Sequence, residues 1–250
     1  MRPEEAARLR LTAAEKKLLR PYYDLCDLGR YSLAATPSLA LIYSTRTTCP
    51  DIEAYPNLRA HLVRFRDIME MRRETRNGAN SWWHLHWPRD ETLWESAKIL
   101  SVQMGARPAF VPVEQPVYVP FSVNVFVPFE TTNEHLYYIT ALLNSRLMWK
   151  WYRHHAKRRG IGLEINGNVL ARTPIRTINF SDAADEARHE RAVSLVAAML
   201  AAKRQLAGAG TDAERSLYER RCAALDAQID ALVYELYALT PPEIALVEAS

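Results

Sequence analysis

Apolar side chains recur at helical spacing in three stretches of the first 160 residues. Residues 12–20 open with Thr12 and carry Glu15 three positions later, a pairing typical of a helix N-terminus because each residue can cap the other. Residues 53–74 and 133–153 are longer, and we expect each to form a helix with one buried face. Their apolar positions are Leu58, Leu62, Phe65, Ile68 and Met69 in the first, and Leu136, Ile139, Leu143 and Leu147 in the second.

Strands are expected where β-branched and aromatic residues are bounded by turn residues. Residues 39–43 (LALIY) predict one strand, and residues 97–129 predict several short ones. The prolines of the second stretch suit sheet edges and turns, not helices. A basic segment, KRRGIG (157–162), is expected to form a loop that leads into a short strand, GLEIN. The prolines lie at positions 108, 112, 116, 120 and 128.

The C-terminal 70 residues predict helices that pack on each other. One helix is expected from about Asp182 to Leu206, and GAGT (208–211) ends it. The second starts near Asp212 and carries a narrow apolar stripe, which is typical of an antiparallel helix pair. A short last helix begins at the prolines of PPEIALVEA. The stripe consists of Leu225, Ile229, Leu232 and Leu236.

These elements predict an α+β fold, with a mainly antiparallel sheet flanked by helices and a C-terminal antiparallel helical hairpin. We expect residues 1–181 to form one domain and residues 182–250 to form the hairpin and a tail that pack on it. A hydrophobic content of 48% and a charged content of 24% are ordinary for a globular protein. No apolar run is long enough to span a bilayer and the N-terminus lacks a signal peptide's apolar core, so a cytoplasmic location is expected.

Charge is unevenly distributed along the chain. Residues 1–181 hold 25 Lys and Arg against 17 Asp and Glu, whereas residues 182–250 hold 7 against 12. A basic body suits a polyanionic partner, and an acidic tail does not. The three cysteines are far apart and form no CxxC pair, so neither a zinc ribbon nor a disulfide framework is expected.

Catalytic motifs are missing from the sequence. An amino-methyltransferase needs an Asn/Asp-Pro-Pro-aromatic tetrapeptide and a glycine-rich cofactor turn, but the one Pro-Pro pair stands between Thr240 and Glu243. Asp90, Glu95 and Lys98 leave a metal-dependent nuclease open as an alternative, although the spacing from the last carboxylate to the lysine is one residue too long. The histidine pairs 84/86 and 154/155 lack the spacing of metal ligands.

Three segments fit contact with nucleic acid. Residues 72–78 (RRETRNG) place arginines at a helix end, and arginine can fork onto guanine or phosphate. Residues 81–89 (SWWHLHWPR) combine tryptophans with an arginine, which suits stacking and groove contact. Residues 149–160 (WKWYRHHAKRRG) carry five Lys and Arg and no acid. Tryptophans in a core and a solvated basic helix end are the structural alternatives.

These segments, in this order, resemble a known family. Residues 55–62, 72–74, 82–89 and 98–99 are similar to the TaqI-like C-terminal specificity domain of type IIG restriction–modification enzymes and of Eco57I-like adenine-specific DNA methyltransferases. Residues 137–145 resemble that family's Leu-Asn-Ser helix, and residues 173–175 its Pro-Ile element. Residues 229–240, followed by Glu243 and Ile244, resemble the end of these polypeptides.

The resemblance implies a target-recognition domain that reads double-stranded DNA for a catalytic domain elsewhere. Residues 1–181 would be the recognition domain. S-adenosylmethionine and Mg²⁺ would bind only to that methyltransferase or nuclease partner, and no cofactor is expected in this chain. A protein-interaction or assembly subunit of a restriction or phage-defence system stays open as an alternative.

The candidate contacts fall into two groups. Arginines and aromatics near the predicted turn at 77–81 are assigned to base reading, because recognition residues usually lie on loops held by a scaffold. Cations in acid-free segments are assigned to phosphate, which offers charge without sequence information. The base-reading candidates are Arg72, Arg73, Arg76, Trp83, His84, His86 and Arg89; the phosphate candidates are Arg46, Lys98, Lys150, Arg153, Lys157, Arg158 and Arg159.

Overall fold

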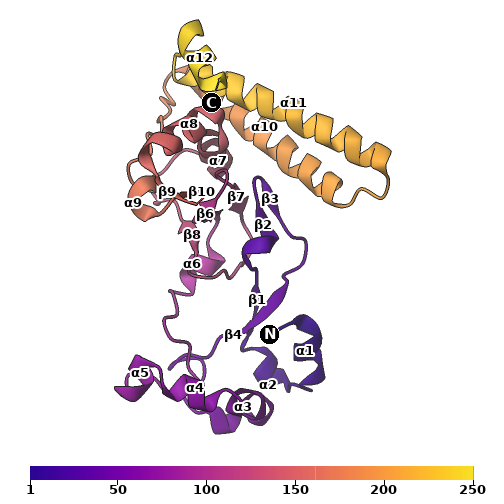
Figure 1. Cartoon of the computed structure of the whole chain (residues 1–250), viewed down its shortest axis with the longest axis vertical. Helices are drawn as coiled ribbons and strands as arrows, with labels where there is room; N and C mark the ends of the chain where they lie inside the picture. The colour runs from indigo at the N-terminus through magenta and orange to yellow at the C-terminus, as the bar shows by residue number, and fades with distance from the viewer. Residues whose placement is uncertain (161, 250) are drawn as a thin grey trace. The chain divides into compact units, whose positions relative to one another are not determined.

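The computed structural model describes residues 1–160 and 162–249, and the chain divides into two compact units (Figure 1). Unit 1 comprises residues 1–27, 34–96 and 115–120, and unit 2 comprises residues 28–33, 97–114 and 121–250. Small antiparallel sheets and a C-terminal pair of long helices confirm the predicted α+β class. The C-terminal helices belong to the same compact unit as the sheet of residues 97–126, so the expected boundary at residue 181 lies inside unit 2.

Unit 1 has short helices around a two-stranded sheet. Strand β4 (Leu39–Ile42) forms where it was predicted and pairs with β1 (Leu19–Tyr22). The helices are α1 (Pro3–Arg8), α2 (Ala13–Lys16), α3 (Pro56–Val63), α4 (Arg66–Glu70), α5 (Arg73–Arg76) and α6 (Thr92–Glu95), with 3-10 turns η1 (Leu25–Asp27) and η2 (Ile52–Ala54). The core of this unit contains Leu11, Leu18, Cys49, Ile52, Leu58 and Leu62.

One buried carboxylate joins two of these helices. Glu15 forms the predicted capping box with Thr12, whose hydroxyl accepts from the Glu15 amide at 3.2 Å. The same carboxylate also accepts from the backbone amides of Asn57, at 2.7 Å, and Leu58, at 3.1 Å, at the start of α3. Burial alone would raise the pKa of Glu15, but these hydrogen bonds outweigh it and lower the pKa to about 2.

The single helix expected over residues 53–74 is broken into α3, α4 and α5. At each break an arginine side chain takes a carbonyl that a continuing helix would use. Arg64 Nε donates to the carbonyl of His61 at 3.2 Å, and Arg72 Nε donates to that of Met69 at 3.0 Å. Such side-chain donors satisfy the last carbonyls of a helix and favour its end.

Unit 2 contains the predicted antiparallel sheet of residues 97–129. Strand β5 (Lys98–Val102) is central, with β7 (Phe110–Val113) on one side and β8 (Val123–Phe126) on the other. A second sheet has the order β6 (Met104–Gly105), β10 (Gly162–Glu164), β9 (Lys157–Arg159). The remaining elements are β2 (Leu28–Gly29), β3 (Ser32–Leu33), α7 (Leu136–Asn144), α8 (Arg146–His155), α9 (Gly167–Leu170), α10 (Ala183–Ala207), α11 (Asp212–Leu236) and α12 (Pro241–Glu248).

The Leu-Asn-Ser signature marks a helix break that the apolar spacing did not predict. Asn144 uses its side-chain amide like a neighbouring strand: its Oδ1 accepts from the Phe110 amide at 3.0 Å and its Nδ2 donates to the Phe110 carbonyl at 2.8 Å. Ser145 is extended, and its hydroxyl caps α8 by accepting from the Met148 amide at 3.2 Å. The expected helix over residues 133–153 is therefore two helices, α7 and α8, anchored to β7.

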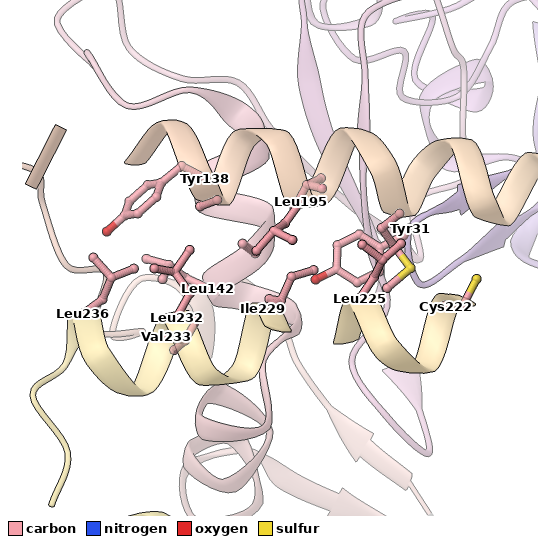
Figure 2. Packing of buried hydrophobic residues seen from close by; sticks show 14 of the residues in the cluster. Tyr31, Tyr138, Leu142, Leu195, Cys222, Leu225, Ile229, Leu232, Val233 and Leu236 are labelled. Carbon is pink, nitrogen blue, oxygen red and sulfur yellow. The ribbon is translucent and has the colours of Figure 1, made fainter. Parts of the chain in front are cut away.

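Helices α10 and α11 form the predicted hairpin (Figure 1). Thr211 begins α11 with a capping box to Glu214. The predicted apolar stripe of α11 is buried against α10 and α7. Figure 2 shows Tyr31 and Tyr138 packed with it. The hairpin is therefore part of the hydrophobic core of unit 2.

Candidate nucleic-acid interface

In unit 1, the segment between α5 and α6, residues 77–91, forms the loop that we call the tryptophan loop. Its first half is fixed to the segment that follows β4. The Leu85 amide donates to the carbonyl of Ser44 at 2.8 Å, and the Ser44 hydroxyl donates to the carbonyl of Trp83. Gly78 adopts a φ of +69°, which glycine accepts without strain at the end of a helix. These hydrogen bonds fix the tryptophan loop to the segment that follows β4.

Two side chains that were predicted to read DNA bases instead anchor the tryptophan loop. Trp83 Nε1 and His84 Nε2 both lie within hydrogen-bond distance of the Cys49 carbonyl, at 2.9 and 3.0 Å. Burial lowers the pKa of His84, and its Nδ1 accepts from the Ser81 amide at 3.2 Å, so the ring is neutral at pH 7 with its proton on Nε2. A base-reading role does not fit Trp83 or His84, because their polar atoms are used within the fold.

Arg72 is likewise engaged within unit 1. Besides its bond to Met69, its guanidinium donates to the carbonyl of Trp82 at 2.7 Å, and burial lowers its pKa. Arg72 connects the end of α4 to the tryptophan loop. Two of its nitrogens are therefore engaged within the fold, and base reading by Arg72 would break these bonds.

The outer part of the tryptophan loop and α5 present the side chains that remain. Arg73 and Arg76 are exposed, and neither makes a side-chain hydrogen bond or ion pair within the described residues. His86 is exposed and lies 3.0 Å from the carboxylate of Glu74. Trp87 is 74% exposed and is one of several large apolar residues on the surface. Trp87 was not among the candidates, and its position in a segment without apolar periodicity is the only signal of exposure in the sequence.

The last two candidates of unit 1 differ in exposure. Arg89 is half-buried, with its guanidinium 5.6 Å from the centre of the Trp94 ring, and the backbone carbonyl of Arg89 accepts from the hydroxyl of Tyr43. Arg46 is exposed in the loop after β4. Arg46 can therefore reach a ligand from its present position, whereas Arg89 would first leave its aromatic contact.

The phosphate candidates of unit 2 also differ in exposure and in their hydrogen bonds. Lys98 is fully buried in β5, and burial lowers its pKa to about 8, so a phosphate role does not fit it. Lys150 Nζ donates to the carbonyl of Leu246 in α12 at 2.6 Å, so this ammonium group is already hydrogen-bonded within unit 2. Arg153 is exposed on the last turn of α8.

The expected basic loop at residue 157 is instead strand β9, paired with β10. Because side chains of a strand alternate between faces, Arg158 points to one face, and Lys157 and Arg159 point to the other. Arg159 pairs with Glu164 at 2.8 Å, whereas Lys157 and Arg158 are exposed and make no side-chain ion pair within the described residues. Ile161, also part of the predicted loop, lies outside the described residues.

The residues of the nuclease alternative show no metal-ligating arrangement. Asp90 accepts from the amide and hydroxyl of Thr92, and Glu95 is exposed. Over residues 1–160 and 162–249, no group of three or more His, Cys, Asp and Glu side chains is placed to hold a metal ion. Within the same residues, no helix has the length and apolar character to cross a membrane.

Comparisons with known proteins agree with the sequence resemblance. Residues 61–175 match the family model of the TaqI-like C-terminal specificity domain, which confirms the predicted resemblance. A solved structure of the type IIL restriction–modification enzyme MmeI in complex with DNA superposes with a TM-score of 0.66 at 15% sequence identity. The match covers 98% of this chain and 32% of that one, so the chain spans about a third of the larger protein. No curated protein sequence matches.

Proposed function

We propose that this chain, which carries a match to a specificity domain over residues 61–175, recognises a DNA sequence for a restriction–modification enzyme. The observation that carries the proposal is this match, together with exposed cations mounted on fixed scaffolds. In unit 1, α5 and the tryptophan loop present Arg73, Arg76 and His86. In unit 2, α8 and β9 present Arg153, Lys157 and Arg158. The structural similarity to a DNA-bound enzyme supports the fold.

In this proposal the two sets of cations have different tasks. Arg73 and Arg76 read base edges, because an arginine that forks onto guanine discriminates by about 1–3 kcal/mol. The cations of α8 and β9 hold backbone phosphates, because a contact to phosphate positions the protein without reading sequence. Trp87 contributes an exposed aromatic surface beside the base-reading set.

The catalytic partner is an adenine-N6 DNA methyltransferase domain, alone or fused to a nuclease. That partner, rather than this chain, binds S-adenosylmethionine and Mg²⁺. The target adenine is turned out of the duplex into the partner's pocket, because its amine cannot be reached within the base stack. This chain grips the remaining duplex and sets which adenine is presented.

The proposal is tested by selection from a pool of duplexes with a randomised central segment. The chain is immobilised, bound duplexes are recovered over several rounds, and their sequences are compared with the starting pool. A short enriched motif is the expected result, and Arg76→Ala relaxes one or two of its positions. Recovery of sequences indistinguishable from the input would contradict sequence recognition. Failure to retain any duplex would favour a protein-interaction role instead.

A further inference from the structure

An open hollow of about 450 Å³ lies in unit 2 between α8 and the β9–β10 hairpin. Trp149 and Arg153 line it from α8, four residues apart and hence on one face of the helix. Arg158 lines it from β9, beside Leu163 of β10, its cross-strand partner. Two guanidinium groups and an indole from two separate elements therefore line one space.

Glycine backbone completes the wall of the hollow. Gly162 lies so close to β6 that a Cβ there would stand 2.8 Å from the carbonyl oxygen of Gly105, so no larger residue fits without a backbone shift. Gly160 has a φ of +57°, which lets the hairpin turn tightly beside Arg158. Gly160 and Gly162 thus contribute main chain without side chains to the lining, and Gly162 also permits the close approach of β10 to β6.

The charge of the hollow selects an anion. Arg153 and Arg158 make no side-chain ion pair within the described residues, and no acidic side chain is among those that line the hollow. A neighbouring hollow of about 370 Å³, which Trp149 also lines, has three arginines and three acidic residues in its lining: Arg30, Arg107, Arg146, Asp226, Asp230 and Glu248. There Arg30 pairs with Asp226, and Arg146 pairs with Asp230. The lining of the hollow at Arg153 therefore carries net positive charge, whereas the arginines and carboxylates of the neighbouring lining balance.

We propose that this hollow binds a single unpaired nucleotide of the DNA, with its phosphate between Arg153 and Arg158 and its base or sugar against Trp149. The inference rests on the proposed function and deepens it. A phosphate alone would use only the cationic wall, whereas the hollow also offers an indole and a volume in the range of small-molecule sites. Stacking on an aromatic ring is independent of base identity, so the site accepts any of the four bases.

The test compares two duplexes that differ by one extra, unpaired thymidine in one strand. Binding of the full chain is followed by fluorescence anisotropy at low salt. The chain is expected to bind the bulged duplex about tenfold more tightly than the perfect one, the order of magnitude of one stacked base. Arg158→Gln and Arg153→Gln remove this preference. Lys157→Gln, on the opposite face of the same strand, is the matched comparison: it weakens binding of both duplexes alike and leaves the ratio of their affinities unchanged.

A second readout follows the base itself. With 2-aminopurine as the unpaired nucleotide, contact with the indole quenches its fluorescence when the chain binds. Trp149→Leu abolishes this quenching, and a melting curve checks that the variant is folded. Arg153→Gln and Arg158→Gln test the site independently of Trp149. Both arginine side chains are exposed, so their replacement leaves the core intact.

The outcomes separate the two proposals. Equal affinity for bulged and perfect duplexes overturns the nucleotide site but leaves DNA recognition standing. A preference that survives Arg158→Gln and is lost in Lys157→Gln also overturns it, since the contact would then lie on the other face. Failure to bind either duplex overturns both proposals, and capture of an acidic peptide by the same arginines would identify the hollow as a protein contact.

Discussion

Arg72 and Arg76 form a matched pair that separates support of the tryptophan loop from contact with DNA. The two residues lie one turn apart. Arg72 donates to the carbonyls of Met69 and Trp82, whereas Arg76 is exposed and has no side-chain partner within the described residues. Arg72→Ala should therefore lower stability, and Arg76→Ala should change the choice of DNA sequence.

The size of the Arg72 effect follows from its two hydrogen bonds. At a half-buried site each contributes about 1 kcal/mol net, and loss of the guanidinium also leaves two carbonyls to be satisfied by water. A destabilisation of about 2 kcal/mol is expected. For a chain of this size that corresponds to a melting temperature lower by roughly 4–8 °C. Arg76→Ala should stay within about 0.5 kcal/mol of the parent, as exposed substitutions usually do.

The assay has two arms. Thermal unfolding is followed by tryptophan fluorescence, because Trp82 and Trp83 lie at the base that Arg72 supports. Competition binding then gives the affinity ratio of a selected duplex to a scrambled one. An Arg72→Ala variant with unchanged stability but a reduced ratio would refute the reasoning, since Arg72 would then be a DNA contact. An Arg76→Ala variant with an unchanged ratio would refute the assignment of Arg76 to base reading.

Four further predictions concern single residues. Because the folded pKa of Glu15 is lowered to about 2, its contribution to stability is complete above the unfolded value of about 4.5 and is lost as pH falls from there towards 2; Glu15→Gln should flatten this part of the stability–pH curve in urea titrations. Asn144→Ala leaves the Phe110 amide without its acceptor, while the Phe110 carbonyl keeps the Tyr31 amide as a donor, and should cost about 1–3 kcal/mol by denaturant unfolding. Gly162→Ala forces the hairpin away from β6 and should cost about 1–3 kcal/mol, measured the same way. Lys157→Ala should weaken binding about equally for selected and scrambled duplexes in competition assays, and a sequence-dependent loss would count against a phosphate contact.

Elements governed by local pattern were predictable from the sequence. The hairpin follows from an apolar stripe with spacings of four, three and four residues and from the Thr211–Glu214 cap, both of which belong to one helix. The sheet of residues 97–129 follows from the distribution of prolines. In these segments the local preference and the tertiary fold agree.

Breaks set by distant partners were not predictable. Whether α7 continues past Asn144 depends on Phe110, which is 34 residues away in the chain. Three successive cations at residue 157 predict a loop by composition, but pairing with β10 makes them a strand and divides them between two faces. Pairing of this kind depends on tertiary context, which local composition does not encode.

The candidate site was predictable in part for the same reason. Sequence reasoning located the segments that carry exposed cations, and Arg73, Arg76, Arg153 and Lys157 are indeed on the surface. It could not show that Trp83 and His84 share the carbonyl of Cys49, because that acceptor lies more than 30 residues earlier. Residue type identifies what a side chain can bind, and only the fold shows whether a partner within the chain already occupies it.

The most direct test of DNA recognition is a salt titration of the full chain with a selected duplex and a scrambled one. If the four remaining phosphate candidates, Arg46, Arg153, Lys157 and Arg158, all contact phosphate, raising salt from 50 to 200 mM should lower both affinities by about a hundredfold. Parallel slopes are expected, with the selected duplex bound more tightly at every salt concentration. Affinities that do not respond to salt, or that coincide for the two duplexes throughout, would contradict sequence-specific DNA recognition by this chain.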